Sequence, residues 1–437
     1  MFISVLKYIN KPAIGIMLVM MLRSAGFAVP PDVNIGIGGQ GGGKIVIAVS
    51  RFFPDDPKKT EEIGASDITS ILRNDLFMNG AFSLRDGPEL SEENAELNFI
   101  ELIKQGNEYL CTASYSTKKG EITLTGALFS VKNTYRLFKK KFKGPADEHR
   151  NIVHQFSEEI IRLLLGTGGL TDSKITFVSK KSGYKEVYVV DYDGYGVRQI
   201  TRDMSTALLP RWAPDRKRII YTSYKGGQPQ LYLINEEGGQ PEKLLSLQNP
   251  NIGGSWSPDG KSIALTIAKD GNSDIWIYEL KTKELKKLTN TWSIETSVSW
   301  MRNGRQLLFT SDRTGSPQVY LIDVEGTNLR RLTFEGKYND SAVCSPNGDR
   351  IAYVSLESNK FNIYTMRVDG SDGRRLTYNG GSNETPSWSP DSRYIVFSSS
   401  QSGIKSIYMI TAEGEYETRL INLSADSENP SWSRFIK

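Results

Sequence analysis

The hexapeptide Ser255-Trp256-Ser257-Pro258-Asp259-Gly260 recurs, whole or in part, along the C-terminal part of this 437-residue chain. Its tryptophan position repeats every 44 residues without a break and is filled by Trp212, Trp256, Trp300, Cys344, Trp388 and Trp432. An uninterrupted period of this length with strand-like content is typical of a β-propeller or a related array. The repeat therefore decides the fold class of this part of the chain.

Each repeat unit alternates strand signals with turn signals. Pro-Asp-Gly suits a tight reversal, because proline fixes φ and glycine accepts a positive φ. It is followed by a β-rich run such as residues 350–355, a second run such as 318–323, a turn such as 368–370 and a third run such as 374–377. Together with the tryptophan strand these make four short antiparallel strands, which is one propeller blade.

The two ends of the repeat predict how the ring closes. The strand signal at residues 174–179 matches the run that follows each tryptophan strand, but its own unit has Gly168 at the tryptophan position. The surplus strand at Trp432 can supply the missing strand, so that both ends of the propeller share one blade. We therefore expect an all-β six-bladed β-propeller over residues 170–437, with no open sheet edge.

Residues 44–166 lack the repeat and mix element types. Strand patterns occur at 44–50, 109–115, 122–131 and 135–142, and one helical stripe is made by Ile68, Ile71, Leu72 and Leu76. A closing helix ends at the glycines of residues 166–169, and its apolar face carries Ile152, Val153, Phe156, Ile160, Leu163 and Leu164. We expect a smaller N-terminal α+β domain, joined to the propeller by this short linker.

The N-terminus has the pattern of an export signal. Lys7 and Lys11 precede an apolar run at residues 13–22, and Gly26-Phe27-Ala28 places small residues where a signal peptidase reads. A membrane anchor is the alternative, but this run is much shorter than the roughly 20 apolar residues that span a bilayer. The pattern predicts a signal peptide at residues 1–28, cleavage between Ala28 and Val29, a flexible tail at 29–43, and a location in the periplasm or outside the cell.

Composition and motifs favour binding over catalysis. A net charge of +4 over this length does not indicate nucleic acid as a partner. The glycine-rich run at residues 38–44 resembles a phosphate-binding loop, but Ile45 stands where that loop needs Ser or Thr, and the glycines precede a strand. His149 and His154 are the only histidines, so the propeller has neither a Ser-His-Asp triad nor a histidine metal centre. We expect no enzyme activity, no cofactor and no metal.

Three smaller features have structural explanations. Asp191-Tyr192-Asp193-Gly194 indicates a hairpin turn, with calcium binding as the alternative. The basic run at residues 139–143 indicates a solvated strand edge, with an anionic partner as the alternative. Cys111 and Cys344 lie in separate domains, which predicts two free thiols, and the place of Cys344 in the repeat indicates buried packing.

The loops that lead into the tryptophan strands form the candidate binding site. These strands are innermost in a propeller, so their leading loops gather around one mouth of the central channel, a typical place for recognition. Turn chemistry alone is the alternative at each position. The candidate partner-binding residues are mostly small, polar or acidic: Thr206, Asn251, Ile252, Glu295, Thr296, Asn339, Asp340, Asn383, Glu384, Thr385, Glu428 and Asn429.

Several motifs together resemble the TolB family of the bacterial Tol-Pal system. They are the run at residues 147–154, the glycines at 166–169, Asp191-Tyr192-Asp193-Gly194-Tyr195 and the repeated Trp-Ser-Pro-Asp-Gly. The resemblance covers essentially the whole chain after the signal peptide. Met301-Arg302, Cys344 and the glycine-rich tail depart from the repeat or the family pattern.

The resemblance implies a periplasmic, non-enzymatic binding hub. It implies that the propeller mouth binds the lipoprotein Pal at the outer membrane, and that the segment after the signal peptide binds TolA of the inner-membrane complex. Outer-membrane integrity and envelope constriction during cell division would depend on it. In the tail, Val33, Ile35 and Ile37 alternate with polar or glycine positions, so that the tail can add as a strand to a partner's sheet.

We expect a monomer that is attached to the envelope only through its protein partners. The alternative function is the propeller domain of an exported hydrolase or lyase. A hydrolase of this kind needs an α/β-hydrolase domain, and a propeller lyase needs a histidine cluster; the sequence has neither.

Overall fold

The computed structural model describes residues 44–55, 64–88, 99–166, 168–245, 247–269 and 271–434. The predicted signal peptide, its cleavage site and the tail at residues 29–43 lie outside these residues. The segment from Gly42 to Lys437 clusters as one structural unit. Within the described ranges, no helix is long and apolar enough to cross a bilayer.

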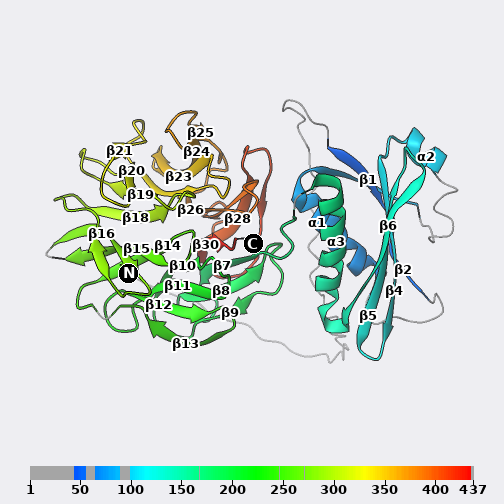
Figure 1. Ribbon diagram of the computed structural model, residues 1–437, viewed down its shortest axis with the longest axis horizontal. Helices are drawn as coiled ribbons and strands as arrows, with labels where there is room; N and C mark the ends of the chain where they lie inside the picture. Colours follow the sequence, from blue (N-terminus) through cyan, green and yellow to red (C-terminus); the bar gives the residue numbers. More distant parts are fainter. Residues whose placement is uncertain are drawn as a thin grey trace, which may run out of the picture. The chain divides into compact units, whose positions relative to one another are not determined.

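The amino-terminal domain is built on a mixed sheet with the strand order β3-β1-β4-β5-β6, and β2 pairs with β4 (Figure 1). β1 is parallel to β3 and β4, whereas β5 is antiparallel to β4 and β6. The basic run at residues 139–143 lies on β6, at the edge of the sheet. The strands are β1 (Ile45–Val49), β2 (Phe53–Pro54), β3 (Phe82–Asp86), β4 (Tyr109–Lys118), β5 (Glu121–Ser130) and β6 (Tyr135–Pro145).

Helices cover this sheet. α1 (Ala65–Asn79) and α3 (His149–Leu165) share one core with Ile47 of β1, whereas α2 (Phe99–Lys104) packs with Ala48. Successive strand residues point to opposite faces, so these two clusters lie on the two sides of the sheet. A short 3₁₀ helix (Ala146–Glu148) precedes α3.

The predicted strands and helices of this domain are confirmed, with one error on the apolar face of α3. Leu163 is 50% exposed, and Ile161 is buried instead. The reason is the linker, which folds back onto α3: the backbone N–H of Gly169 donates to both carboxylate oxygens of Glu158, at 2.9 and 2.8 Å. A Cβ on Gly169 would lie 2.9 Å from Ile161. α3 ends at Gly166, whose φ of +69° is the left-handed cap expected there.

The propeller consists of six four-stranded antiparallel sheets. The inner strands are β10 (Ala207–Trp212), β14 (Asn251–Trp256), β18 (Glu295–Trp300), β22 (Asn339–Cys344), β26 (Asn383–Trp388) and β30 (Ser427–Trp432). The second strands are β7 (Lys174–Ser179), β11 (Arg218–Ser223), β15 (Ser262–Lys269), β19 (Gln306–Ser311), β23 (Arg350–Glu357) and β27 (Tyr394–Ser399).

The third strands are β8 (Glu186–Asp191), β12 (Gln230–Asn235), β16 (Asn272–Glu279), β20 (Gln318–Asp323), β24 (Lys360–Arg367) and β28 (Ser406–Thr411). The short outer strands are β9 (Arg198–Gln199), β13 (Gly238–Lys243), β17 (Leu285–Lys287), β21 (Arg330–Arg331), β25 (Arg374–Arg375) and β29 (Glu417–Arg419).

The ring closes as the repeat predicts. β30, at the red end of the chain in Figure 1, pairs antiparallel with β7 and completes the sheet β30-β7-β8-β9. Trp432 lies opposite Ile175, and the backbone N–H of Ser433 donates to the carbonyl of Lys174 at 2.9 Å. The first and last strands of the propeller therefore hold each other in one blade.

Every inner strand contains a β-bulge at the same place. The pairing register shifts between the second and fifth residue of each strand. The third residue has a left-handed φ of 50° to 67° in all six: Leu209, Gly253, Ser297, Ser341, Thr385 and Asn429. Five of these are not glycine, so a strained backbone is built into the wall of the channel around the whole ring.

Candidate functional site

The strand order fixes which loops share a face of the propeller. Inner and third strands run one way, and second and outer strands run the other, because neighbours in each blade are antiparallel. One face, here called the mouth face, therefore contains the loops into the inner strands (200–206, 244–245, 247–250, 288–294, 332–338, 376–382 and 420–426) and the described residues of the hairpins between second and third strands. The other, the turn face, contains the Pro-Asp-Gly turns and the hairpins between third and outer strands.

All twelve predicted mouth residues lie at or beside the start of inner strands, so the structure brings them together around the channel. Four of them are buried, however: Asn251, Glu295, Asn339 and Asn383. Their side chains hold neighbouring loops. Asn251 Oδ1 accepts from the backbone N–H of Leu231 at 2.8 Å, and Asn339 Nδ2 donates to the carbonyl of Glu335 at 2.7 Å. These four side chains support the mouth from beneath, and the binding of a partner at these positions stays a prediction.

The other eight predicted residues are half-buried at the channel: Thr206, Ile252, Thr296, Asp340, Glu384, Thr385, Glu428 and Asn429. Three carboxylates are among them. Lys405 lies between two, with its Nζ 3.0 Å from Glu384 Oε2 and 3.7 Å from Glu428 Oε2. Asp340 Oδ1 accepts from Thr310 at 2.7 Å, and its charge, after burial, helps to raise the pKa of Tyr338 to about 12. The mouth is thus acidic but partly neutralised.

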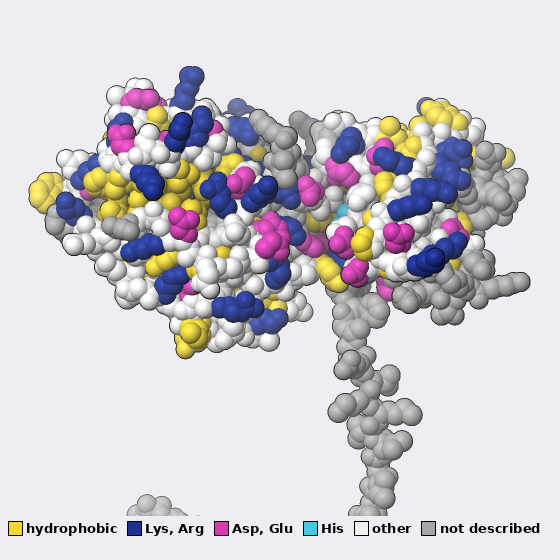
Figure 2. Space-filling model, turned by 60° about the horizontal axis from the view of Figure 1, so that its bottom comes forward, with side chains coloured by type: hydrophobic (Ala, Val, Ile, Leu, Met, Phe, Trp, Pro, Cys, Tyr) yellow, Lys and Arg dark blue, Asp and Glu magenta, His cyan; other side chains and the backbone are white. Residues whose placement is uncertain are grey.

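The mouth face also exposes large apolar side chains that sequence reasoning missed. Trp292 is 100% exposed, Phe334 74% and Tyr378 73%, and all three lie in loops that lead into inner strands. Five more large apolar side chains are exposed on this face: Met204, Ile294, Tyr184, Tyr224 and Ile404. On the described part of the turn face, the only exposed large apolar side chains are Tyr195 and Leu329. Figure 2 shows an extended hydrophobic patch among lysine and arginine side chains on the propeller surface. Large apolar side chains that are exposed on one face of a protein are typical of interaction sites.

Two of these aromatic rings have an arginine guanidinium group stacked on them. The guanidinium of Arg331 lies 5.1 Å from the Phe334 ring centre, and that of Arg375 lies 4.6 Å from Tyr378. The two pairs are one repeat apart. The sequence signal for this surface was a set of aromatic residues outside the strand positions of the repeat, of which Trp292 is the clearest.

The turn face carries the contact with the amino-terminal domain. Arg393 Nη1 donates to the carbonyl and to Oδ1 of Asn79, at 2.6 and 2.9 Å, and Phe77 packs edge-on against Tyr416. Asp193, in the turn after β8, pairs with Arg150 of α3. The turn at residues 191–194 is therefore a hairpin with Gly194 at φ +85°. The carboxylate in this turn is that of Asp193, and its partner is Arg150 of the same chain. Among the described residues no cluster of three potential metal ligands occurs.

A buried polar network lies between the domains. Asp75 of α1 accepts hydrogen bonds from Ser157 at 2.6 Å and from the hydroxyl of Tyr192, and its Oδ2 lies 2.8 Å from His154 Nδ1. Burial opposes the charged form of His154, but Asp75 outweighs burial and keeps the pKa of His154 above its ordinary value. Burial raises the pKa of Asp193, although Arg150 opposes this shift. His154 thus serves as the ion-pair partner of Asp75 rather than as a metal ligand.

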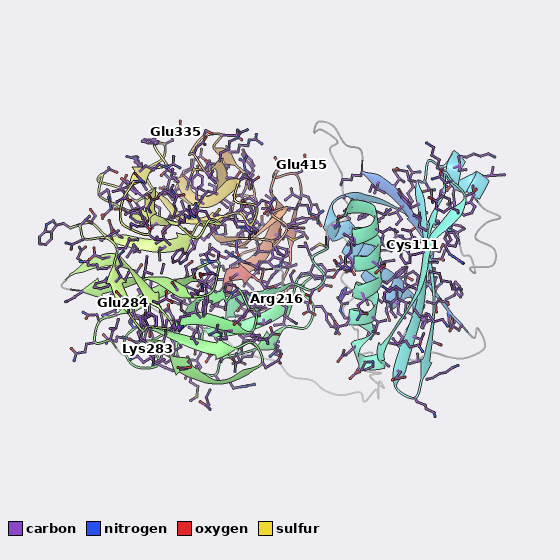
Figure 3. All side chains as sticks on the ribbon, viewed as in Figure 1. Cys111, Arg216, Lys283, Glu284, Glu335 and Glu415 are labelled. Carbon is purple, nitrogen blue, oxygen red and sulfur yellow. The ribbon has the colours of Figure 1, made fainter. Side chains whose placement is uncertain are left out.

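The two cysteines are free thiols in different surroundings. Cys111, labelled in Figure 3, is fully buried in the sheet of the amino-terminal domain, where burial raises the pKa of its thiol. The sequence predicts a buried Cys344, but this residue is half-buried and lines a cavity in the channel together with the tryptophans of the other blades.

Comparison with known proteins agrees with this architecture. The family model described as TolB beta propeller domain matches residues 161–436, and the one described as TolB amino-terminal domain matches residues 33–137. The chain belongs to the TolB family.

Individual TolB relatives are more distant. The chain is 35% identical over 157 residues to a protein TolB homolog of Chlorobium chlorochromatii, which is 35% of this chain and 36% of that protein. It is 35% identical over 155 residues to the Tol-Pal system protein TolB of Geobacter sulfurreducens, again 35% of this chain and 36% of that protein. The alignments thus span little more than a third of these relatives' length.

The crystal structure of TolB from Acinetobacter baumannii covers more of the chain. It has a TM-score of 0.79 at 25% identity, over 92% of this chain and 99% of that one. Membership of the TolB family therefore rests on both domains, and the described fold is that of a TolB structure throughout.

Proposed function

We propose that this chain is a periplasmic, non-enzymatic binding hub of the Tol-Pal system that binds Pal on its mouth face and TolA through its tail. In this role it links the outer membrane to the inner-membrane complex and supports envelope constriction during cell division. Family membership supports the system, since relatives of this chain are Tol-Pal system proteins. The propeller sequence, which has no histidine, supports a binding role over hydrolysis.

The exposed apolar side chains of the mouth face are the observation that carries the Pal site. Interface energy concentrates in a few aromatic or arginine side chains, surrounded by contacts of lesser effect. Trp292, Phe334 and Tyr378 are aromatic, exposed and held on loops between rigid strands. The amino-terminal domain contacts the turn face, so it leaves this surface free for a partner.

Titration calorimetry with the soluble domain of Pal tests this site. Trp292→Ala and Phe334→Ala should each leave the melting temperature unchanged, and at least one should weaken Pal binding roughly 30-fold, the effect of a hot-spot side chain. Leu329→Ala is the matched control, because Leu329 is an exposed apolar residue on the turn face. Wild-type affinity in both mouth variants, and in Tyr378→Ala, would place the Pal site elsewhere.

The TolA site is proposed on residues 29–43, which lie outside the described residues. Val33, Ile35 and Ile37 alternate in a way that suits strand addition to a partner. Deleting residues 29–43 after the signal peptide should abolish TolA binding and keep Pal binding. TolA binding that survives the deletion would contradict this part of the proposal.

Export is tested separately, by mass spectrometry of the mature protein from periplasmic extracts. A mature N-terminus at Val29 is expected, and a retained Met1 in a membrane fraction would contradict it.

A further inference from the structure

Two arginines interrupt a ring of prolines at the turn face of the channel. The proline of the repeat motif is Pro214, Pro258, Pro346 or Pro390 in four blades, but Arg302 and Arg434 stand at the same position in the other two. All six line one cavity of about 800 Å³. Arg302 and Arg434 are three repeat units apart, so they lie on opposite sides of a six-bladed ring.

A third arginine lies one layer deeper in the channel. Arg211 lines a smaller cavity of about 120 Å³, together with Arg434 and the Trp212 side chain. In the other five blades this position is Ser or Val, as at Ser255 and Val343. Arg211, Arg302 and Arg434 therefore bring three positive charges to one end of the channel.

These charges have no carboxylate partner among the described residues. Arg211 Nη1 donates only to the carbonyl of its neighbour Pro210, at 3.1 Å. The only carboxylate in the lining of either cavity is Asp391, and Arg393 already pairs with it at 2.6 Å. Burial lowers the pKa of Arg211 to about 10, and burial together with the charge of Arg302 lowers the pKa of Arg434. Arg302 is exposed, but Arg211 and Arg434 are half-buried, so an anion placed here would offset the cost of holding these two cations partly away from water without a counter-charge.

We propose that the turn-face end of the channel is a binding site for a small polyvalent oxyanion, held between Arg302 and Arg434 with Arg211 beneath it. Guanidinium groups donate two parallel hydrogen bonds to phosphate or carboxylate oxygens, and two facing groups suit an anion with oxygens at both ends. The larger cavity has a volume typical of small-molecule sites. The prolines have no N–H, so the arginines provide the main donors.

The site would also lie next to the junction of the two domains. Gly168 of the linker and Arg393, which holds Asn79 of α1, line the same cavity. It is separate from the mouth face, where the Pal site is proposed, so the failure of either proposal leaves the other standing.

Inorganic pyrophosphate and citrate, titrated separately at constant ionic strength, test the site and distinguish phosphate from carboxylate ligands. We expect millimolar or tighter binding of at least one of them. Arg302→Gln and Arg434→Gln should each weaken it roughly tenfold, since each removes charge-assisted hydrogen bonds. Arg305→Gln, an exposed arginine of the same turn outside the cavity lining, should bind like the wild type.

A chemical readout covers the case in which a variant does not fold. Cys344 lines the inner cavity beside Arg434, whereas Cys111 is fully buried, so iodoacetamide should alkylate Cys344 selectively in the folded protein. Burial raises the pKa of the Cys344 thiol, so the reaction is carried out at alkaline pH, where more of the reactive thiolate is present. The bound anion should slow this alkylation in the wild-type chain, and sodium chloride at equal ionic strength should not. The proposal is overturned if neither anion binds, or if binding persists undiminished in the folded Arg302→Gln/Arg434→Gln protein. Alkylation unaffected by saturating anion would overturn it as well.

Discussion

Removing the indole of Trp432 should destabilise the propeller more than any change at its surface. This side chain is only 5% exposed, and its strand is the one that closes the ring on β7. Its Nε1 donates to Ser173 Oγ at 2.9 Å, a bond that reaches from the last strand of the propeller to the segment before the first. Trp432→Ala therefore acts at the seam of the ring.

The size of the effect follows from the buried contacts. Truncation of a buried tryptophan to alanine costs about 3 to 5 kcal/mol. Loss of the hydrogen bond to Ser173 adds about 1 kcal/mol. For a domain of this size each kcal/mol lowers the melting temperature by about 2 to 4 °C, so we expect a decrease of about 10 °C or more.

Differential scanning calorimetry of Trp432→Ala measures this decrease, and Trp292→Ala is the matched control. Both variants lose an indole, but Trp292 is fully exposed, and its loss should change stability by no more than about 0.5 kcal/mol. Equal melting temperatures for the two variants would refute the assignment of β30 as the closing strand of the ring.

A change of pH and substitutions at three buried residues test the packing inside the two domains. Stability should fall as pH rises through the elevated pKa of His154, because the pair with Asp75 stabilises the fold fully below the ordinary pKa of 6.5 and loses its effect above the folded value. The stability of His154→Gln should not fall in this way as the pH rises. If it does, groups other than His154 cause the pH dependence. Gly126→Ala should cost about 1 to 3 kcal/mol in urea unfolding, since its Cβ would lie 2.4 Å from the Phe156 ring; wild-type stability would show that the ring can move. Asn383→Ala should cost about 1 to 3 kcal/mol, because the buried side chain donates to the carbonyl of Gly381 at 3.2 Å, and an unchanged melting temperature would remove its structural role.

Much of the propeller could be predicted, because each blade repeats one solution to the same packing problem. The constant spacing of the tryptophan position gave the number of blades, and the missing anchor at Gly168 gave the closure by β30. In the amino-terminal domain the long alternating strands were visible in the sequence, but β3 and α2 were not. β3 has five residues and α2 six, too few for a periodic pattern to stand out. β1 is as short as β3, but its five residues are all apolar, which made that strand visible.

For the candidate site, only the loops that meet at the mouth could be predicted, and not which of their side chains are buried or exposed. The bulge in each inner strand breaks the simple alternation of inward and outward residues, so the pattern could not show that Asn383 is buried. The exposure of Trp292 depends on how its loop folds away from the blade, which no local periodicity records. The arginines of the channel line one cavity only when the ring closes, since Arg302 and Arg434 belong to opposite blades.

Site-specific photo-crosslinking in the cell envelope tests the central claim most directly, since it reports which face of the propeller meets Pal. A photoreactive phenylalanine analogue at position 292 on the mouth face should crosslink to Pal, and the same analogue at position 329 on the turn face should not. Crosslinks to Pal from position 329, with none from 292, 334 or 378, would contradict the account.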